Sequence, residues 1–211
     1  MSQDKREFDI IIWGASGFTG RLVAEYLFQK YNSKDLKWAI AGRDKAKLAS
    51  VRDSYLDTSI PILIADSFDE VSLNKVTTRT KVICSTVGPY SKYGSLIVKS
   101  CIESGTDYCD LAGESQWIRK MIDFYHKKAE SNKVKIVNSC GFDSIPSDMG
   151  VYFIYKDILK KDLQISMRVA GAKGGYSGGY QAFSGPKIQF NEWTNVGANA
   201  CVNAGNKAAV I

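Results

Sequence analysis

The sequence predicts an α/β protein with a doubly wound parallel sheet, followed by an incomplete C-terminal appendage. Through the first 165 residues, short β-branched runs alternate with longer amphipathic segments, an order typical of such a sheet with right-handed crossovers. The strand candidates are continuous apolar runs, as expected for parallel strands that are buried on both faces. A chain of 211 residues, 45% hydrophobic and 24% charged, is long enough to bury a sizeable core.

The expected strands are the apolar runs between turn-forming residues: Phe8–Trp13, Leu36–Ala41, Pro61–Ala65, Lys81–Val87, Tyr108–Leu111, Val134–Ser139 and Leu163–Val169. The segments between them are expected to be helices, over 18–31, 44–55, 94–104, 114–132 and 147–160. The helix over 114–132 has the clearest period, which places Trp117, Met121 and Phe124 on one apolar side.

Composition excludes several classes of function. The net charge of +6 comes from scattered lysines and arginines without a long basic block, so we expect no nucleic-acid partner. Five cysteines without a CxxC pair, together with a single histidine, predict no metal site. The polar start of the chain and the absence of a long apolar run favour an intracellular, cytoplasmic protein.

The most specific motif follows the first expected strand and opens the first helix. In Gly14-Ala-Ser-Gly-Phe-Thr-Gly20, the first glycine permits a tight turn, the second lets the backbone approach a pyrophosphate, and the third allows close packing of the helix. The free N–H groups of the helix would bind the phosphates. The spacing is GxxGxxG rather than GxGxxG, and a turn that binds nothing is the alternative. We predict a Rossmann-type cofactor site that includes Gly14, Ser16, Gly17, Phe18, Thr19 and Gly20.

The end of the second strand indicates which dinucleotide binds. An NAD site normally has an acidic residue there for the ribose 2′-hydroxyl, whereas this chain has Arg43, which suits a 2′-phosphate. We therefore expect NADP(H) to be preferred over NAD(H). Two alternatives are a solvated loop arginine and an arrangement in which Asp44 turns inward.

Two further strand ends should meet the same crevice, because ligands bind outside the carboxyl ends of the strands. Asp66 can accept a hydrogen bond from an adenine amino group. The nicotinamide ribose should lie beside the small-residue turn after the fourth strand, although a plain turn without a ligand is equally compatible with its sequence. The residues of this turn are Thr86, Val87, Gly88, Pro89 and Tyr90.

Five ordered motifs resemble the saccharopine dehydrogenase-like oxidoreductases over about residues 8–178. They are GASGFTG at 14–20, AGR at 41–43, TVGPYSKYG at 86–94, YCDLAGE at 108–114 and CGFDSIPSDMG at 140–150. The resemblance implies a Rossmann domain that uses NADP(H) for hydride transfer, followed by a larger α+β domain. Relatives include bacterial trans-acting enoyl reductases, and animal members are associated with lipid droplets and membranes. It thus implies a role in lipid or glycolipid metabolism and peripheral membrane association, without naming a substrate or catalytic residues.

The C-terminal part departs from that family pattern. Eight of the 18 glycines lie between Gly171 and the C-terminus, and those of residues 170–180 prevent an assignment to helix or strand. We expect an NAD(P)-binding domain over 1–165 and, over 166–211, the Gly-rich start of a truncated or divergent substrate-side domain. The chain would then resemble an animal-type member shortened at its C-terminus, either active or a non-catalytic cofactor-binding fragment.

A rival interpretation is a short-chain-dehydrogenase-like enzyme. Tyr152 and Lys156 form a YxxxK pair, with Ser139 upstream, and the lysine would lower the pKa of the tyrosine so that it acts as a general acid. Tyr26 and Lys30 show the same spacing, so the pair arises easily by chance. The saccharopine-like motifs fit the chain better.

Overall fold

The computed structural model describes residues 6–31, 35–142, 144–153, 164–172 and 175–183. The chain divides into two compact units. The first comprises Met1–Asp110 and Gln116–Val137, and the second comprises Leu111–Ser115 and Asn138–Ile211. The predicted domain boundary at residue 165 stays a prediction.

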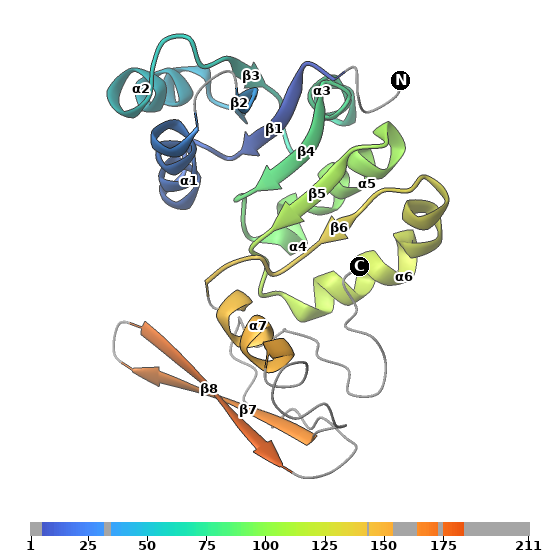
Figure 1. Cartoon of the computed structure of the whole chain (residues 1–211). Coiled ribbons are helices and arrows are strands. Elements are labelled where there is room, and N and C mark those ends of the chain that lie inside the picture. The colour runs from blue at the N-terminus through green and yellow to red at the C-terminus, as the bar shows by residue number, and fades with distance from the viewer. Residues whose placement is uncertain (1–5, 32–34, 143, 154–163, 173–174, 184–211) are drawn as a thin grey trace. The chain divides into compact units, whose positions relative to one another are not determined.

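The first unit contains a six-stranded sheet whose paired strands all run parallel (Figure 1). The strand order is β3-β2-β1-β4-β5-β6, so successive strands are added on one side of β1 up to β3 and on its other side from β4 onward. This order confirms the predicted Rossmann-type fold. The strands are β1 (Phe8–Trp13), β2 (Trp38–Gly42), β3 (Ile62–Ile64), β4 (Thr80–Ser85), β5 (Asp107–Asp110) and β6 (Ile136–Val137).

The helices of this unit connect successive strands. They are α1 (Phe18–Lys30), α2 (Lys45–Tyr55), α3 (Glu70–Thr77), α4 (Tyr90–Tyr93), α5 (Ser95–Ser104) and α6 (Ser115–Ser131). Helix α3 was not predicted, because its eight residues provide only about two turns of periodicity. Asp69 marks its start, since its side chain accepts a hydrogen bond from the Val71 N–H at 3.0 Å.

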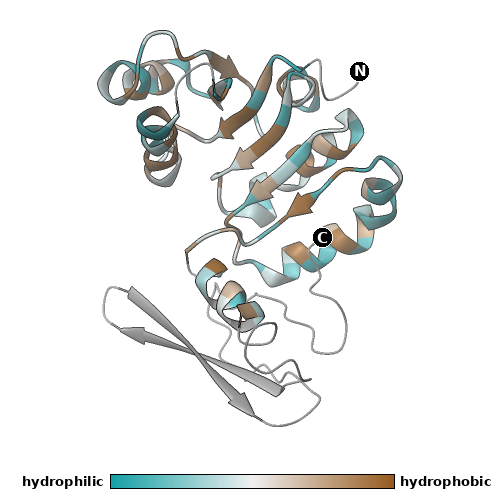
Figure 2. Cartoon of the chain, viewed as in Figure 1, coloured by the Kyte–Doolittle hydropathy of each residue, from teal (hydrophilic) through white to brown (hydrophobic). Residues whose placement is uncertain are grey.

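The core forms where the apolar strands meet the helices. Ile11, Ile12, Ile40 and Ile83 are fully buried, as the continuous apolar runs predicted. Hydrophobic and hydrophilic residues alternate in bands along α6 (Figure 2), and Trp117 and Met121 are buried there. The placement of Phe124 on the buried side was wrong, because its side chain is 69% exposed.

The second unit contains α7 (Ile145–Phe153) and an antiparallel pair, β7 (Gln164–Ala172) with β8 (Gly175–Phe183). The expected seventh strand therefore exists, but its placement in the parallel sheet was wrong. Its partner β8 lies in the glycine-rich segment for which no helix or strand was predicted. Glycine has low strand propensity, so the pairing from Gln164↔Phe183 to Ala172↔Gly175 is not visible in composition. The expected helix over 147–160 extends beyond the described residues after Phe153.

Candidate cofactor site

The candidate site lies at the carboxyl ends of β1 to β4, where the strand order reverses. Here β1 leads through a tight turn into α1. The Gly14 N–H donates to the Ala41 carbonyl at 2.8 Å, which ties the turn to β2, and the Gly17 N–H donates to the Gly14 carbonyl at 2.9 Å. The open end of a doubly wound sheet at this point is the usual place for a dinucleotide.

Two glycines of the turn have no room for a side chain. Gly14 has a φ of +93°, and a Cβ there would lie 2.5 Å from a Val87 methyl and 2.9 Å from the Thr86 hydroxyl. At Gly20, a Cβ would overlap the carbonyl oxygen of Gly14. The first turn of α1 therefore packs directly on the loop, as the third glycine of the motif predicts.

The N-terminus of α1 has donors without side-chain acceptors. Gly17 occupies the N-cap and supplies no side-chain hydrogen bond, and the first turn contains no acidic residue. Ser16 is half-buried, Thr19 is exposed, and Phe18 is 75% exposed. The N–H groups of this first turn and the positive end of the helix dipole can thus bind a pyrophosphate.

Arg43 and Asp44 differ sharply at the end of β2. Arg43 is exposed and makes no hydrogen bond or ion pair with any residue that the structure describes. Asp44 instead caps α2, with Oδ1 accepting from the Lys47 N–H at 3.1 Å and Oδ2 lying 3.8 Å from its ammonium. The alternative in which Asp44 turns inward is not the arrangement present. The guanidinium is the group left to meet a ribose phosphate.

Asp66 follows β3 and shapes the turn into α3. Its Oδ1 accepts from the Phe68 N–H at 2.8 Å, and its own N–H donates to the Ser72 hydroxyl at 3.1 Å. Within the described residues, Oδ2 has no hydrogen-bond partner. One carboxylate oxygen is therefore available for the predicted contact with an adenine amino group.

The turn after β4 divides into two parts. Thr86 donates its hydroxyl hydrogen bond to the carbonyls of Trp13 and Gly14, at 3.1 and 3.3 Å, so this side chain joins the turn to the glycine loop. Gly88 and Pro89 are exposed and joined by a cis peptide bond. Tyr90 is 5% exposed and donates to the Ser85 carbonyl at 3.0 Å, which places its ring in the core.

The structure therefore brings Gly14, Gly20, Thr86 and Val87 into direct contact. Arg43, Asp66, Gly88 and Pro89 follow the carboxyl ends of the same strands. These placements suit the predicted roles, which remain predictions for each side chain. Tyr90 fits a cofactor contact least well, since its hydroxyl and ring are both occupied within the protein.

A buried polar group at the end of β5 was missed as a site feature, although it lies within the YCDLAGE motif. Asp110 is 2% exposed and stands in register with Ser85. The Tyr108 hydroxyl donates to Asp110 Oδ2 at 2.9 Å. Burial, followed by the charge of Asp110, raises the pKa of Tyr108 well above its ordinary value. Tyr108 therefore remains a protonated donor to a buried carboxylate.

The residues of the short-chain-dehydrogenase alternative lie in the second unit or beyond the described residues. Tyr152 is 49% exposed on α7, whereas Lys156 falls outside the described part of the chain. The Ser139 hydroxyl donates to the Ala112 carbonyl at 2.7 Å. That alternative mechanism stays untested.

The described ranges also bear on metal binding and on membrane crossing. They contain no cluster of three or more histidine, cysteine or acidic side chains able to hold a metal ion. Nor does any helix within them combine the length and apolar character that crossing a membrane requires.

Comparison with known proteins gives relatives that are longer than this chain. A putative trans-acting enoyl reductase of Mycobacterium tuberculosis is 41% identical over 185 residues, which cover 85% of this chain and 44% of the relative. A trans-acting enoyl reductase of Mycobacterium leprae is 41% identical over 163 residues, which cover 76% of this chain and 38% of the relative. The chain thus spans less than half the length of these relatives.

Among solved structures, saccharopine dehydrogenase (L-Glu forming) from Saccharomyces cerevisiae matches with a TM-score of 0.58 and 19% identity, over 77% of this chain and 35% of that protein. Pen from Bacillus thuringiensis matches with a TM-score of 0.52 and 12% identity, over 74% and 57% of the two chains. At these identities the matches support the fold alone. Residues 10–137 match the family model of the saccharopine dehydrogenase NADP binding domain, and the chain belongs to that family.

Proposed function

We propose that this protein takes part in NADPH-dependent reduction of an unsaturated acyl group, with the described first unit holding the cofactor. The observation that carries the proposal is the pairing of a glycine loop closed against Thr86 with an unpaired Arg43 at the next strand end. Identity of 41% to proteins named trans-acting enoyl reductases supports the choice of reaction. The carbon–carbon double bond of the substrate is inferred from those names.

The residues present fit NADP(H). A Cβ at Gly14 or Gly20 would fill the space where the loop and α1 meet, so the backbone there can approach a phosphate closely. Arg43 has no acidic neighbour paired with it, because Asp44 caps α2. The guanidinium can then form a bidentate contact with a 2′-phosphate.

Within this proposal the cofactor supplies the hydride and the protein supplies orientation. The N–H groups of α1 hold the pyrophosphate, and Arg43 fixes the adenosine end. Thr86 holds the turn after β4 against the glycine loop, so this turn would form a rigid side of the site next to the nicotinamide. Reduction of an enoyl group also requires a proton donor, and no residue of this chain is assigned to that role.

The experiment separates binding from turnover in the full chain. NADPH binding is measured by calorimetry, and NADPH oxidation is then followed with a trans-2-enoyl thioester and, separately, with the corresponding saturated thioester. The proposal expects oxidation with the unsaturated thioester alone. Binding without oxidation would refute enoyl reduction by this chain.

The second candidate is a cofactor-binding protein without turnover. The described cofactor site can bind NADPH without hydride transfer, which needs a substrate site as well. Tight NADPH binding with no oxidation of any enoyl thioester would support this candidate. Failure to bind either NADPH or NADH would refute both candidates.

A further inference from the structure

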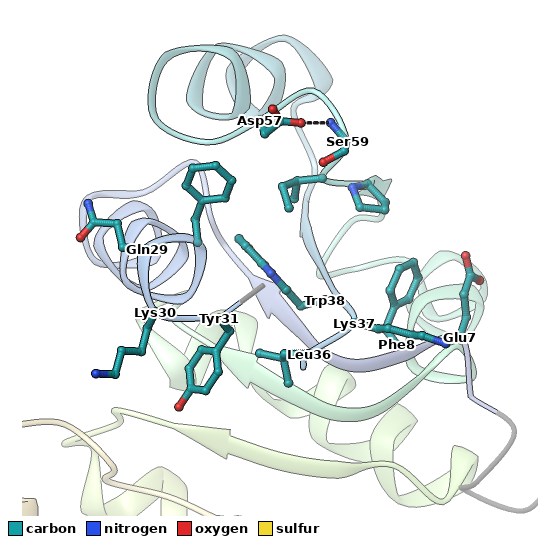
Figure 3. A pocket seen from close by; sticks show the side chains of 13 residues that line it. Glu7, Phe8, Gln29, Lys30, Tyr31, Leu36, Lys37, Trp38, Asp57 and Ser59 are labelled. Atoms are coloured by element: carbon teal, nitrogen blue, oxygen red, sulfur yellow. Dashed lines mark hydrogen bonds between the residues drawn. The ribbon is translucent and has the colours of Figure 1, made fainter. Parts of the chain in front are cut away.

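A cavity of about 820 Å³ lies at the amino ends of the first strands (Figure 3). The glycine loop lies at the opposite, carboxyl ends of the strands. The wall of the cavity comes from the C-terminal end of α1, the start of β1, the segment leading into β2 and the segment leading into β3. All of these belong to the first unit. The volume is within the range of roughly 300–1,000 Å³ that small-molecule sites occupy.

The floor of this cavity is apolar and aromatic. Trp38 belongs to the buried core, and Leu36 and Ile60 pack against the same core while remaining partly exposed. Phe28 at the end of α1 and Tyr31 just beyond it are about 40% exposed. The cavity therefore offers apolar surface alongside polar side chains to an occupant.

One hydrogen-bond donor in this wall has no protein acceptor among the described residues. Trp38 is 5% exposed, yet within the described residues its indole N–H makes no hydrogen bond. Figure 3 shows the Trp38 side chain in the middle of the lining residues, between the end of α1 and the start of β3. The indole nitrogen is not among the fully buried polar atoms that lack a partner, so it is accessible from the cavity and can donate to an occupant.

Two carboxylates and two ammonium groups line the cavity. Glu7 is already held by Arg79 through hydrogen bonds of 2.7 and 2.9 Å, and Asp57 accepts from the Ser59 N–H at 2.7 Å. Lys30 and Lys37 line the same cavity, are exposed, and form no ion pair with any residue the structure describes. Flexible lysine side chains can move to meet an anionic group.

We infer that this cavity is a binding site for a small amphipathic carboxylate, separate from the cofactor site. The apolar body would lie against Phe28, Leu36 and Ile60. The carboxylate would accept the Trp38 indole hydrogen bond and attract the ammonium groups at the rim. This assignment rests on residues at the amino ends of the strands and is independent of the proposed reductase function.

Laurate, kept below its micelle concentration, is the probe. It is titrated into the full chain by calorimetry while the indole N–H resonances are followed by ¹⁵N NMR, and the Trp38 resonance is identified by its loss in Trp38→Phe. Saturable binding of one equivalent with a shift of the Trp38 resonance is expected. Absence of saturable binding, or binding that leaves this resonance unmoved, would overturn the inference.

Variants test the chemistry of recognition. The double variant Lys30→Gln/Lys37→Gln is expected to weaken laurate binding about fivefold, a modest loss because both lysines are exposed. Lys75→Gln, an exposed lysine on α3 outside the cavity, is the matched control and should change the affinity less than twofold. Dodecanol, which has the same chain without the carboxylate, should bind at least fivefold more weakly. Equal binding of laurate and dodecanol would contradict the anion assignment.

Discussion

Replacement of Arg43 by alanine tests the basis of cofactor choice. The side chain is exposed at the end of β2 and has no partner among the described residues, so its removal breaks no hydrogen bond or ion pair within them. The folded protein should therefore keep its stability within about 0.5 kcal/mol, as is usual for a surface substitution. Any larger effect on NADPH binding then reports a contact with the cofactor itself.

The expected magnitude follows from exposure. A bidentate contact between a guanidinium and a phosphate is worth more than a single exposed ion pair of up to about 1 kcal/mol, yet water screens this site. We expect a loss of about 2 kcal/mol, which is roughly thirtyfold in Kd for NADPH. The affinity for NADH, which lacks the 2′-phosphate, should change less than about threefold.

Calorimetric titration of both cofactors into wild type and Arg43→Ala measures the ratio directly. Lys45→Ala is the matched control, because Lys45 is an exposed cation two residues away that begins α2. An equal loss for NADPH and NADH in Arg43→Ala would refute the 2′-phosphate contact. A loss of similar size in Lys45→Ala would show that general charge attraction, rather than a specific contact, determines the preference.

Three further predictions concern the loop, the acid response and the thiols. Gly20→Ala should abolish measurable NADPH binding and lower the melting temperature, because its Cβ would overlap the Gly14 carbonyl. Gly150→Ala on α7 is the control and should leave binding intact, because no atom lies within 4 Å of the added Cβ. Equal binding by both variants would contradict close packing at Gly20. Hydrogen bonds from Lys81 and from the Lys37 backbone lower the pKa of Asp9, so its contribution to stability is full above the unfolded-state pKa and is lost as the pH falls toward the lower folded-state pKa. Asp9→Asn should therefore reduce the fall of the melting temperature with decreasing pH in acid. An unchanged slope of melting temperature against pH would contradict this prediction. Among the described cysteines, iodoacetamide should modify exposed Cys140 before fully buried Cys101, whose pKa burial raises and which should react only on unfolding. Early modification of Cys101, detected by peptide mass spectrometry, would contradict the packing of α5.

The sequence predicted best where local physics alone determines the structure. The motif from Gly14 to Gly20 requires its glycines because a Cβ at either end would meet backbone or side-chain atoms of the same turn or of the turn after β4. The parallel strands were visible because burial on both faces demands continuous apolar runs. Both signals are present in consecutive residues.

Features that depend on distant partners were not predictable in this way. Phe124 shares a helical period with buried Met121, yet it is 69% exposed, because burial depends on what packs against each position of the helix. Tyr90 sits in a cofactor-like turn, yet its hydroxyl finds the Ser85 carbonyl and its ring lies 5.5 Å from Trp117. The pairing of β8 with β7 likewise depends on a partner strand, and glycine-rich composition obscures it.

The parallel topology also separates the two sites that the first unit offers. Strand β1 begins at Phe8, which lines the cavity at the amino ends of the strands, and ends at Trp13, next to the glycine loop. Six residues of strand span about 20 Å, so one small ligand cannot touch both ends. If β1 and β2 act as rigid elements, saturating NADPH should change the affinity for laurate less than twofold. A larger change would mean that the sheet transmits strain between its edges, and a complete loss of laurate binding would mean that laurate occupies the cofactor edge instead.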